Sequence, residues 1–153
     1  MRNLLDNPYL QLAARFILGG FFIVAAVGKI AAPEAFAKEI SNYQILPLSL
    51  VNLTAIFLPW LELVTGVAIV AGIWIRANAL LITAMLVVFT IAIISALARG
   101  LEIDCGCFAQ SADKADWLTV ARDLGLLALS LYLYVIPSRK FSLDALAYRG
   151  IPA

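Results

Sequence analysis

Four long apolar stretches, separated by short polar connections, make up most of the chain. The clearest spans 77–98, a run without a charged residue between Arg76 and Arg99. The other three lie at about 10–30, 50–75 and 117–136. A helix needs about 20 apolar residues to cross a bilayer, and the stretches lack the two-residue alternation of strands. The pattern predicts an all-α integral membrane four-helix bundle, with residues 1–153 forming a single domain.

The connection between the first two stretches has a helical pattern of its own. Apolar side chains recur at helical spacing within 33–47: Phe36, Ile40, Tyr43 and Leu46. This predicts a short interfacial amphipathic helix, which we expect to lie over the side of the bundle that carries the cysteines. Pro59, inside the second stretch, is expected to kink its helix. The first stretch is long and three similar ones follow it, so we interpret it as a retained helix rather than a cleaved signal.

The composition excludes several classes of protein. Hydrophobic residues make up 63% of the chain and charged residues 14%, with a mean hydropathy of +0.96. A soluble domain carries roughly a quarter charged residues, and a disordered chain is polar. The net charge of +1 provides no basic face for nucleic acid. Because the chain has no histidine, histidine catalysis and histidine metal sites are excluded. The expected environment is the lipid bilayer.

The charges also predict an orientation. Four spans place both termini on one side, together with five basic residues: Arg2, Arg76, Arg139, Lys140 and Arg149. The two connections on the other side carry Lys38, Arg99 and Lys114, with Lys29 close by. The positive-inside rule therefore places both termini in the cytoplasm by a small margin. We expect a multi-pass membrane protein, with the connection before the fourth span on the extracytoplasmic side.

That connection contains the only two cysteines, Cys105 and Cys107, separated by Gly106. A disulfide requires Cα atoms within roughly 4.4–6.8 Å, and glycine permits the tight backbone turn that this needs. A ring between near neighbours stabilises the fold little and is typical of a labile, redox-active disulfide. Two thiolates also suit copper or zinc, but the chain has no third cysteine to complete a site. The remaining interpretation is that both cysteines are reduced and have no functional role.

Five charged residues fall within or at the ends of the apolar stretches: Arg15, Lys29, Glu62, Arg122 and Asp123. Charges inside a bilayer are costly and usually have a partner or a task. Glu62 is the deepest, and its structural interpretation is a bond to a basic side chain or a tyrosine. Lys29 is expected to extend to the interface. The functional interpretation makes Arg122 and Asp123 catalytic, because a cation lowers a thiol pKa and an acid exchanges protons with a leaving thiol.

A quinone is the cofactor that the sequence leaves open. Trp60, Glu62 and Lys29 are the residues we would assign to binding it. An aromatic belt at the outer interface explains Trp60 without any ligand, as it does Trp117, Tyr43 and Phe108.

Several motifs taken together resemble the MauE/DoxX family of redox-associated four-helix membrane proteins. The resemblance covers about residues 15–134 and lies in the following segments: Arg15-Phe-Ile-Leu-Gly19-Gly20 with Lys29, Phe36 with the segment 40–47, Leu58-Pro59-Trp60-Leu-Glu62 with Gly66, Asp104-Cys105-Gly106-Cys107-Phe108, and Arg122-Asp123-Leu-Gly125. The chain departs from the pattern at Ala109, where the family often has glycine; this changes loop flexibility rather than thiol chemistry.

The resemblance implies an inner-membrane four-helix bundle that acts in disulfide formation or thiol redox of an extracytoplasmic partner. It assigns Cys105 and Cys107 as the redox pair and a thioredoxin-like or disulfide-bearing protein as partner. Quinone-linked disulfide-forming membrane enzymes are similar in size but use a C-x-x-C pair and a second shuttle pair. We therefore expect a thiol–disulfide redox protein with one C-x-C pair. The alternatives are a non-catalytic assembly subunit or chaperone for a partner oxidoreductase, and a soft-metal carrier; a homo-oligomer also stays open.

Overall fold

The regular structure of the chain is helical. The computed structural model describes residues 7–101, 116–136 and 142–143. Its helices are α2 (Pro8–Ala31), α3 (Pro33–Asn42), α4 (Leu48–Ala71), α5 (Ile75–Ala98) and α6 (Trp117–Val135). By length and composition α2, α4, α5 and α6 can each cross a membrane, and the short helix α3 lies between the first two of them. The predicted all-α membrane fold is confirmed.

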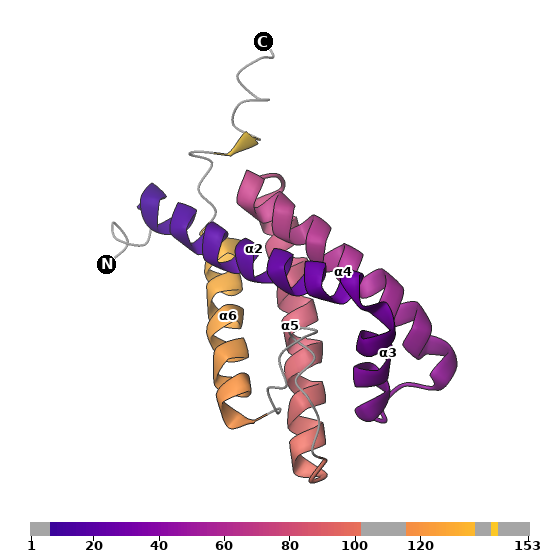
Figure 1. Ribbon diagram of the computed structural model, residues 1–153. Coiled ribbons are helices and arrows are strands. Elements are labelled where there is room, and N and C mark those ends of the chain that lie inside the picture. Colours follow the sequence, from indigo (N-terminus) through magenta and orange to yellow (C-terminus); the bar gives the residue numbers. More distant parts are fainter. Residues whose placement is uncertain (1–6, 102–115, 137–141, 144–153) are drawn as a thin grey trace.

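The four long helices pack as two pairs. α2 packs most extensively against α4, and α5 against α6. Figure 1 shows α5 and α6 side by side, with the α2–α4 pair laid obliquely across them. Successive spans run in opposite directions, so α3 shares one end of the bundle with the end of α5 and the start of α6. We call this end the α3 end.

Local sequence signals set several helix boundaries. The Asn7 side chain accepts a hydrogen bond from the Tyr9 backbone N–H at the start of α2, as expected of an N-cap. The predicted extension of the second span to residue 75 is wrong, because α4 ends at Ala71. Gly72 adopts the left-handed conformation, with φ of 74°, and its N–H closes the last turn of α4. α5 then begins at Ile75, two residues earlier than predicted.

Small residues bring α2 and α4 into close contact. A Cβ atom added to Gly19 would lie 2.6 Å from Val70 Cγ2 and 2.7 Å from the Gly66 carbonyl oxygen. Neither distance is tolerated by a real side chain, so glycine is required at this crossing. Close backbone approach through small residues is a common way for helices to associate in membranes. It explains why this pair has the larger contact.

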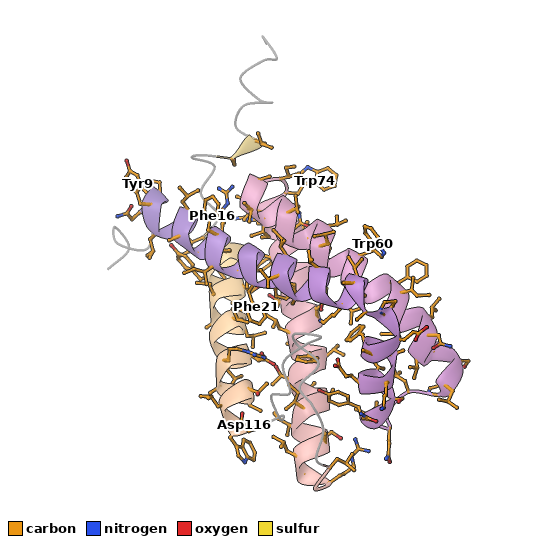
Figure 2. The ribbon with its side chains drawn as sticks, in the orientation of Figure 1. Tyr9, Phe16, Phe21, Trp60, Trp74 and Asp116 are labelled. Carbon is orange, nitrogen blue, oxygen red and sulfur yellow. The ribbon has the colours of Figure 1, made fainter. Side chains whose placement is uncertain are left out.

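Polar side chains and a lipid-facing apolar surface complete the packing. The Ser130 hydroxyl of α6 donates to the Ala79 carbonyl of α5 and lies 2.8 Å from the Thr83 hydroxyl. Large apolar side chains such as Phe57 and Val88 are exposed on the outside, and Figure 2 shows Trp60 and Trp74 pointing outward. An exposed apolar surface of this extent is expected where helices face lipid.

Candidate functional site

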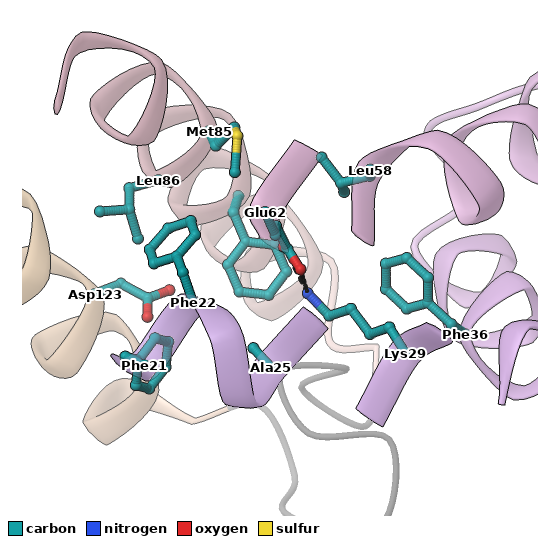
Figure 3. A pocket seen from close by; sticks show the side chains of 11 residues that line it. Phe21, Phe22, Ala25, Lys29, Phe36, Leu58, Glu62, Met85, Leu86 and Asp123 are labelled. Atoms are coloured by element: carbon teal, nitrogen blue, oxygen red, sulfur yellow. Dashed lines mark hydrogen bonds and ion pairs between the residues drawn. The ribbon is translucent and has the colours of Figure 1, made fainter. Parts of the chain in front are cut away.

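A cavity of about 60 Å³ lies between the helices in the half of the bundle toward the α3 end. All five helices contribute to its wall: Phe21, Phe22, Ala25, Lys29, Phe36, Leu58, Glu62, Met85, Leu86, Phe89 and Asp123. Figure 3 shows three charged groups, Lys29, Glu62 and Asp123, among aromatic and aliphatic side chains. A membrane interior that gathers three ionisable groups in one cavity is the strongest candidate for a functional site in the described part of the chain.

Lys29 and Glu62 form a buried ion pair between α2 and α4. The Lys29 Nζ atom lies 2.7 Å from Glu62 Oε1 and 2.9 Å from Oε2. The same ammonium group lies 4.9 Å from the centre of the Phe36 ring, a cation–π distance. The predicted pairing of Glu62 with a basic side chain is therefore confirmed. Lys29 does not extend to the interface as predicted: only 4% of it is exposed, because its ammonium is held between a carboxylate and an aromatic ring.

Asp123 occupies another part of the cavity wall, on α6. The residue is 1% exposed. Its Oδ1 atom accepts hydrogen bonds from Arg122, with Nη2 at 3.1 Å and Nε at 3.3 Å. Arg122 in turn lies over the Phe21 ring, 5.2 Å from its centre. The Oδ2 atom of Asp123 is buried and makes no hydrogen bond to the described residues. The two residues that the sequence assigned as catalytic thus form one pair, with one carboxylate oxygen left over.

The helix α3 contributes to the cavity wall at its own end of the bundle. Phe36 contributes a wall, and Tyr43 packs against Ile93 and Val120 in a small apolar cluster. The Arg99 guanidinium donates to the Tyr43 carbonyl oxygen and ties the end of α5 to α3. Burial raises the pKa of the Tyr43 hydroxyl above its usual range, and the negative charges of Glu39 and Asp123 raise it further. The phenol therefore stays protonated, and it lies within electrostatic range of Asp123.

Arg15 has a different role, at the opposite end of the bundle. Its Nε atom donates to the Ile69 carbonyl at 2.8 Å and its Nη2 atom to the Val70 carbonyl at 2.7 Å. These carbonyls belong to the last turn of α4, where few backbone N–H donors remain, and the Ile69 oxygen also accepts from the Gly72 N–H. A cation there also complements the helix dipole. Arg15 therefore anchors α2 to the end of α4, away from the cavity.

Trp60 lies on the other side of α4 from Glu62. It is 55% exposed and is not part of the cavity wall. Side chains two residues apart in an α-helix differ by about 200° in direction, so Trp60, two residues before Glu62, faces lipid instead of the cavity. The structure brings together two of the three residues assigned to quinone binding, Lys29 and Glu62, and places the third on the outer surface.

Cys105 and Cys107 lie outside the described residues. The connection that carries them leaves α5 after Leu101 and enters α6 at Asp116, both at the α3 end. The Asp116 carboxylate accepts a hydrogen bond from the Thr119 backbone N–H at 2.9 Å and caps α6. This bond is the main reason why the pKa of Asp116 is lowered. In the part of the chain that the structure describes, no three acidic or cysteine side chains gather as they would around a metal ion.

Of the aromatic residues in the cavity wall, sequence reasoning singled out Phe36, on the short helix, and missed Phe21, Phe22 and Phe89. Arg15, Phe22 and Lys29 are spaced seven apart, which places them on one face of a helix and was a usable signal for Phe22. Phe89 lies in an uncharged stretch with no feature that distinguishes it from its lipid-facing neighbours. Its place in the wall depends on how α5 is rotated against the other helices.

These features define the chain as a multi-pass membrane protein with four candidate spans, whose interior holds a charged cavity with aromatic walls. The family model described as methylamine utilisation protein MauE matches residues 7–136. The chain belongs to the MauE family.

Individual relatives agree with this assignment. The chain is 33% identical over 133 residues to the methylamine utilization protein MauE of Paracoccus denitrificans, covering 86% of this chain and 72% of that protein. It is 30% identical over 140 residues to the MauE protein of Methylophilus methylotrophus, covering 90% and 74%. It is 36% identical over 125 residues to that of Methylorubrum extorquens, covering 80% and 67%. No solved structure matches the chain.

Proposed function

We propose that this protein is a membrane thiol–disulfide redox component of methylamine utilisation. It would act through Cys105 and Cys107 at the outer face of the bacterial inner membrane, on a periplasmic thioredoxin-like or disulfide-bearing partner. The names of the MauE relatives support the process. The observation that carries the chemistry is positional: the connection with both cysteines joins the bundle at the α3 end, toward which the charged cavity lies.

The proposed reaction is disulfide exchange. A partner thiolate attacks one sulfur of the Cys105–Cys107 disulfide, the S–S bond breaks, and a mixed disulfide forms. The second partner thiolate then attacks the mixed disulfide. The partner leaves oxidised by two electrons, and Cys105 and Cys107 remain as two thiols. A lipid-soluble quinone accepts two electrons and two protons from these thiols, which restores the disulfide and yields the hydroquinone.

The quinone enters this scheme as a diffusing substrate, because the cavity does not fit it. The cavity has a volume of about 60 Å³, whereas a single benzene ring occupies an engineered protein cavity of about 150 Å³. Lys29 and Glu62 are also fully engaged with each other. The ring would therefore meet the thiols elsewhere at the α3 end.

The test combines thiol trapping with cysteine substitution. A membrane-impermeant alkylating reagent is applied to intact cells with and without prior reduction. We expect labelling only after reduction, since the pair is oxidised and faces outward. The chain has only two cysteines, so Cys105→Ser and Cys107→Ser account for all of the signal. Both variants should abolish disulfide formation in the partner and leave the level of the membrane protein unchanged.

Two results would contradict the proposal. Labelling only after lysis would place the cysteines in the cytoplasm. Unchanged partner disulfides in Cys105→Ser would exclude the redox mechanism and favour a non-catalytic assembly subunit. Co-purification of copper or zinc, bound in proportion to the protein and lost in both variants, would favour a metal carrier.

A further inference from the structure

The cavity contains a polar atom that the described part of the chain does not satisfy. Asp123 is 1% exposed, and its Oδ2 atom makes no hydrogen bond to the described residues, while Oδ1 is held by Arg122. Figure 3 shows this carboxylate directed toward the cavity. A buried carboxylate oxygen without a hydrogen-bond partner is strongly disfavoured. The energetic cost is removed when a water molecule donates a hydrogen bond to the oxygen or when the oxygen itself carries a proton.

The size and lining of the cavity fit water. One water needs about 10–15 Å³ of such space and two to four polar partners. The cavity offers about 60 Å³, which is room for roughly four waters at that requirement. Its polar groups are Asp123 on one helix and the Lys29–Glu62 pair on two others, and the rest of its wall is apolar. Water in the cavity would therefore form hydrogen bonds along a path between Asp123 and the Lys29–Glu62 pair, because the apolar wall offers no other partners.

Other small ligands fit the charges less well. Lys29 is paired with Glu62, and Arg122 is paired with Asp123. The cavity is therefore electrically balanced when all four groups are ionised, and a bound cation or anion would disturb that balance. Bound water leaves this charge balance unchanged. A proton that moves along the water and is then released also causes no lasting change in charge.

The groups that face Asp123 leave it as the site where a proton can be gained or lost. Arg122 does not lose its proton, and the phenol of Tyr43 stays protonated because burial and the charges of Glu39 and Asp123 raise its pKa. Glu62 is engaged by Lys29, which donates two hydrogen bonds to its carboxylate. The described cavity residues on α5 are apolar.

We propose that the cavity is a water-filled proton site, in which Asp123 exchanges protons with the cysteine pair through bound water. This rests on the proposed thiol–disulfide function. When the two thiols are oxidised, each loses a proton: Asp123 accepts one at a time through water and passes it on toward the reduced acceptor. In disulfide exchange the partner thiol loses a proton as it becomes the attacking thiolate, and Asp123 takes up this proton through water and donates it to the cysteine thiolate that leaves. Asp123 lies about 10 Å along α6 from Asp116, where the cysteine connection begins to enter the bundle.

The first part of the test concerns the cavity alone and does not depend on the thiols. Infrared difference spectra between acid and alkaline pH are recorded for the protein in lipid vesicles with Asp isotopically labelled. We expect a labelled carboxyl band that shifts within minutes in D2O, which shows that water reaches a buried carboxyl. The band should disappear in Asp123→Asn and persist in Asp116→Asn, a matched change on an exposed residue of the same connection. A band that does not exchange, or that persists in Asp123→Asn, would overturn the water site.

The second part couples the site to the thiols. Oxidation of the reduced protein by a soluble quinone is followed over a range of pH in a single turnover. General acid–base groups contribute about 10²–10⁴-fold, so Asp123→Asn should slow the reaction at least tenfold and remove one limb of its pH profile. Asp123→Glu should restore both in part, and Asp116→Asn should leave both unchanged. If Asp123→Asn folds, shows the expected infrared loss and oxidises at the normal rate, Asp123 is not coupled to the thiols. Failure of the thiol–disulfide function itself would appear separately, as normal partner disulfides in Cys105→Ser.

Discussion

The buried pair of Lys29 and Glu62 predicts that removing one partner destabilises the protein more than removing the other. The perturbation is replacement of each residue by methionine, singly and together, because methionine is similar in length and carries no charge. The two side chains are 5% and 11% exposed, so in the intact pair each charge is stabilised mainly by its partner rather than by solvent. The pair contacts at 2.7 Å and 2.9 Å, so each substitution removes both hydrogen bonds.

The position of each residue in its helix sets the magnitude. Glu62 lies about 21 Å along α4 from its start, and without Lys29 its charge stays buried. Breaking a buried pair in this way costs about 3–5 kcal/mol, which we expect for Lys29→Met. Lys29 lies in the last turn of α2, and without Glu62 its long side chain can reach the interface. We therefore expect Glu62→Met to cost only about 1–3 kcal/mol, the cost of an unsatisfied buried group.

The double variant isolates the interaction. It leaves no buried charge, so it should be no less stable than Lys29→Met alone, which corresponds to a coupling energy of about 1–3 kcal/mol. The assay is reversible unfolding by sodium dodecyl sulfate in mixed micelles, followed by helical circular dichroism. Costs that add to within about 0.5 kcal/mol would refute the pairing argument. A Glu62→Met variant less stable than Lys29→Met would refute the argument from helix position.

Three further substitutions test the packing, in the same assay. Gly19→Ala should destabilise the α2–α4 crossing by about 1–3 kcal/mol through overpacking; Gly20→Ala, where an added Cβ meets nothing within 4 Å, should not, and equal effects would contradict the close approach. Arg15→Met should cost about 1.5–3 kcal/mol for each lost hydrogen bond from its charged group, whereas the exposed control Arg76→Met should be near neutral; similar losses in both would exclude the helix-end role. Ser130→Ala should cost about 0.6–1.7 kcal/mol, and an unchanged unfolding midpoint would show that the α5–α6 bonds are not needed.

The sequence by itself determined the class of the fold. Hydrophobicity along the chain is a local property, and a bilayer converts a long apolar stretch directly into a spanning helix, because no other open structure satisfies its backbone there. The same reasoning identified charges inside the spans as residues with partners. The predicted second span extended past Gly72, where the helix ends, because hydropathy carries no information about a left-handed residue that stops a helix.

The tertiary structure decided which of these residues meet. Lys29 and Glu62 are 33 residues apart, and their contact depends on how α2 and α4 are rotated, which the glycines at their crossing permit. The rotation of α4 also turns Trp60 toward lipid, and the packing of α6 leaves one oxygen of Asp123 without a hydrogen-bond partner among the described residues. Helix formation depends on residues that are close in sequence, whereas the direction of each side chain in the bundle depends on packing between helices that are distant in sequence. The charged residues within the spans can be identified from the sequence, whereas the cavity that Lys29, Glu62 and Asp123 share is formed only by the packed helices.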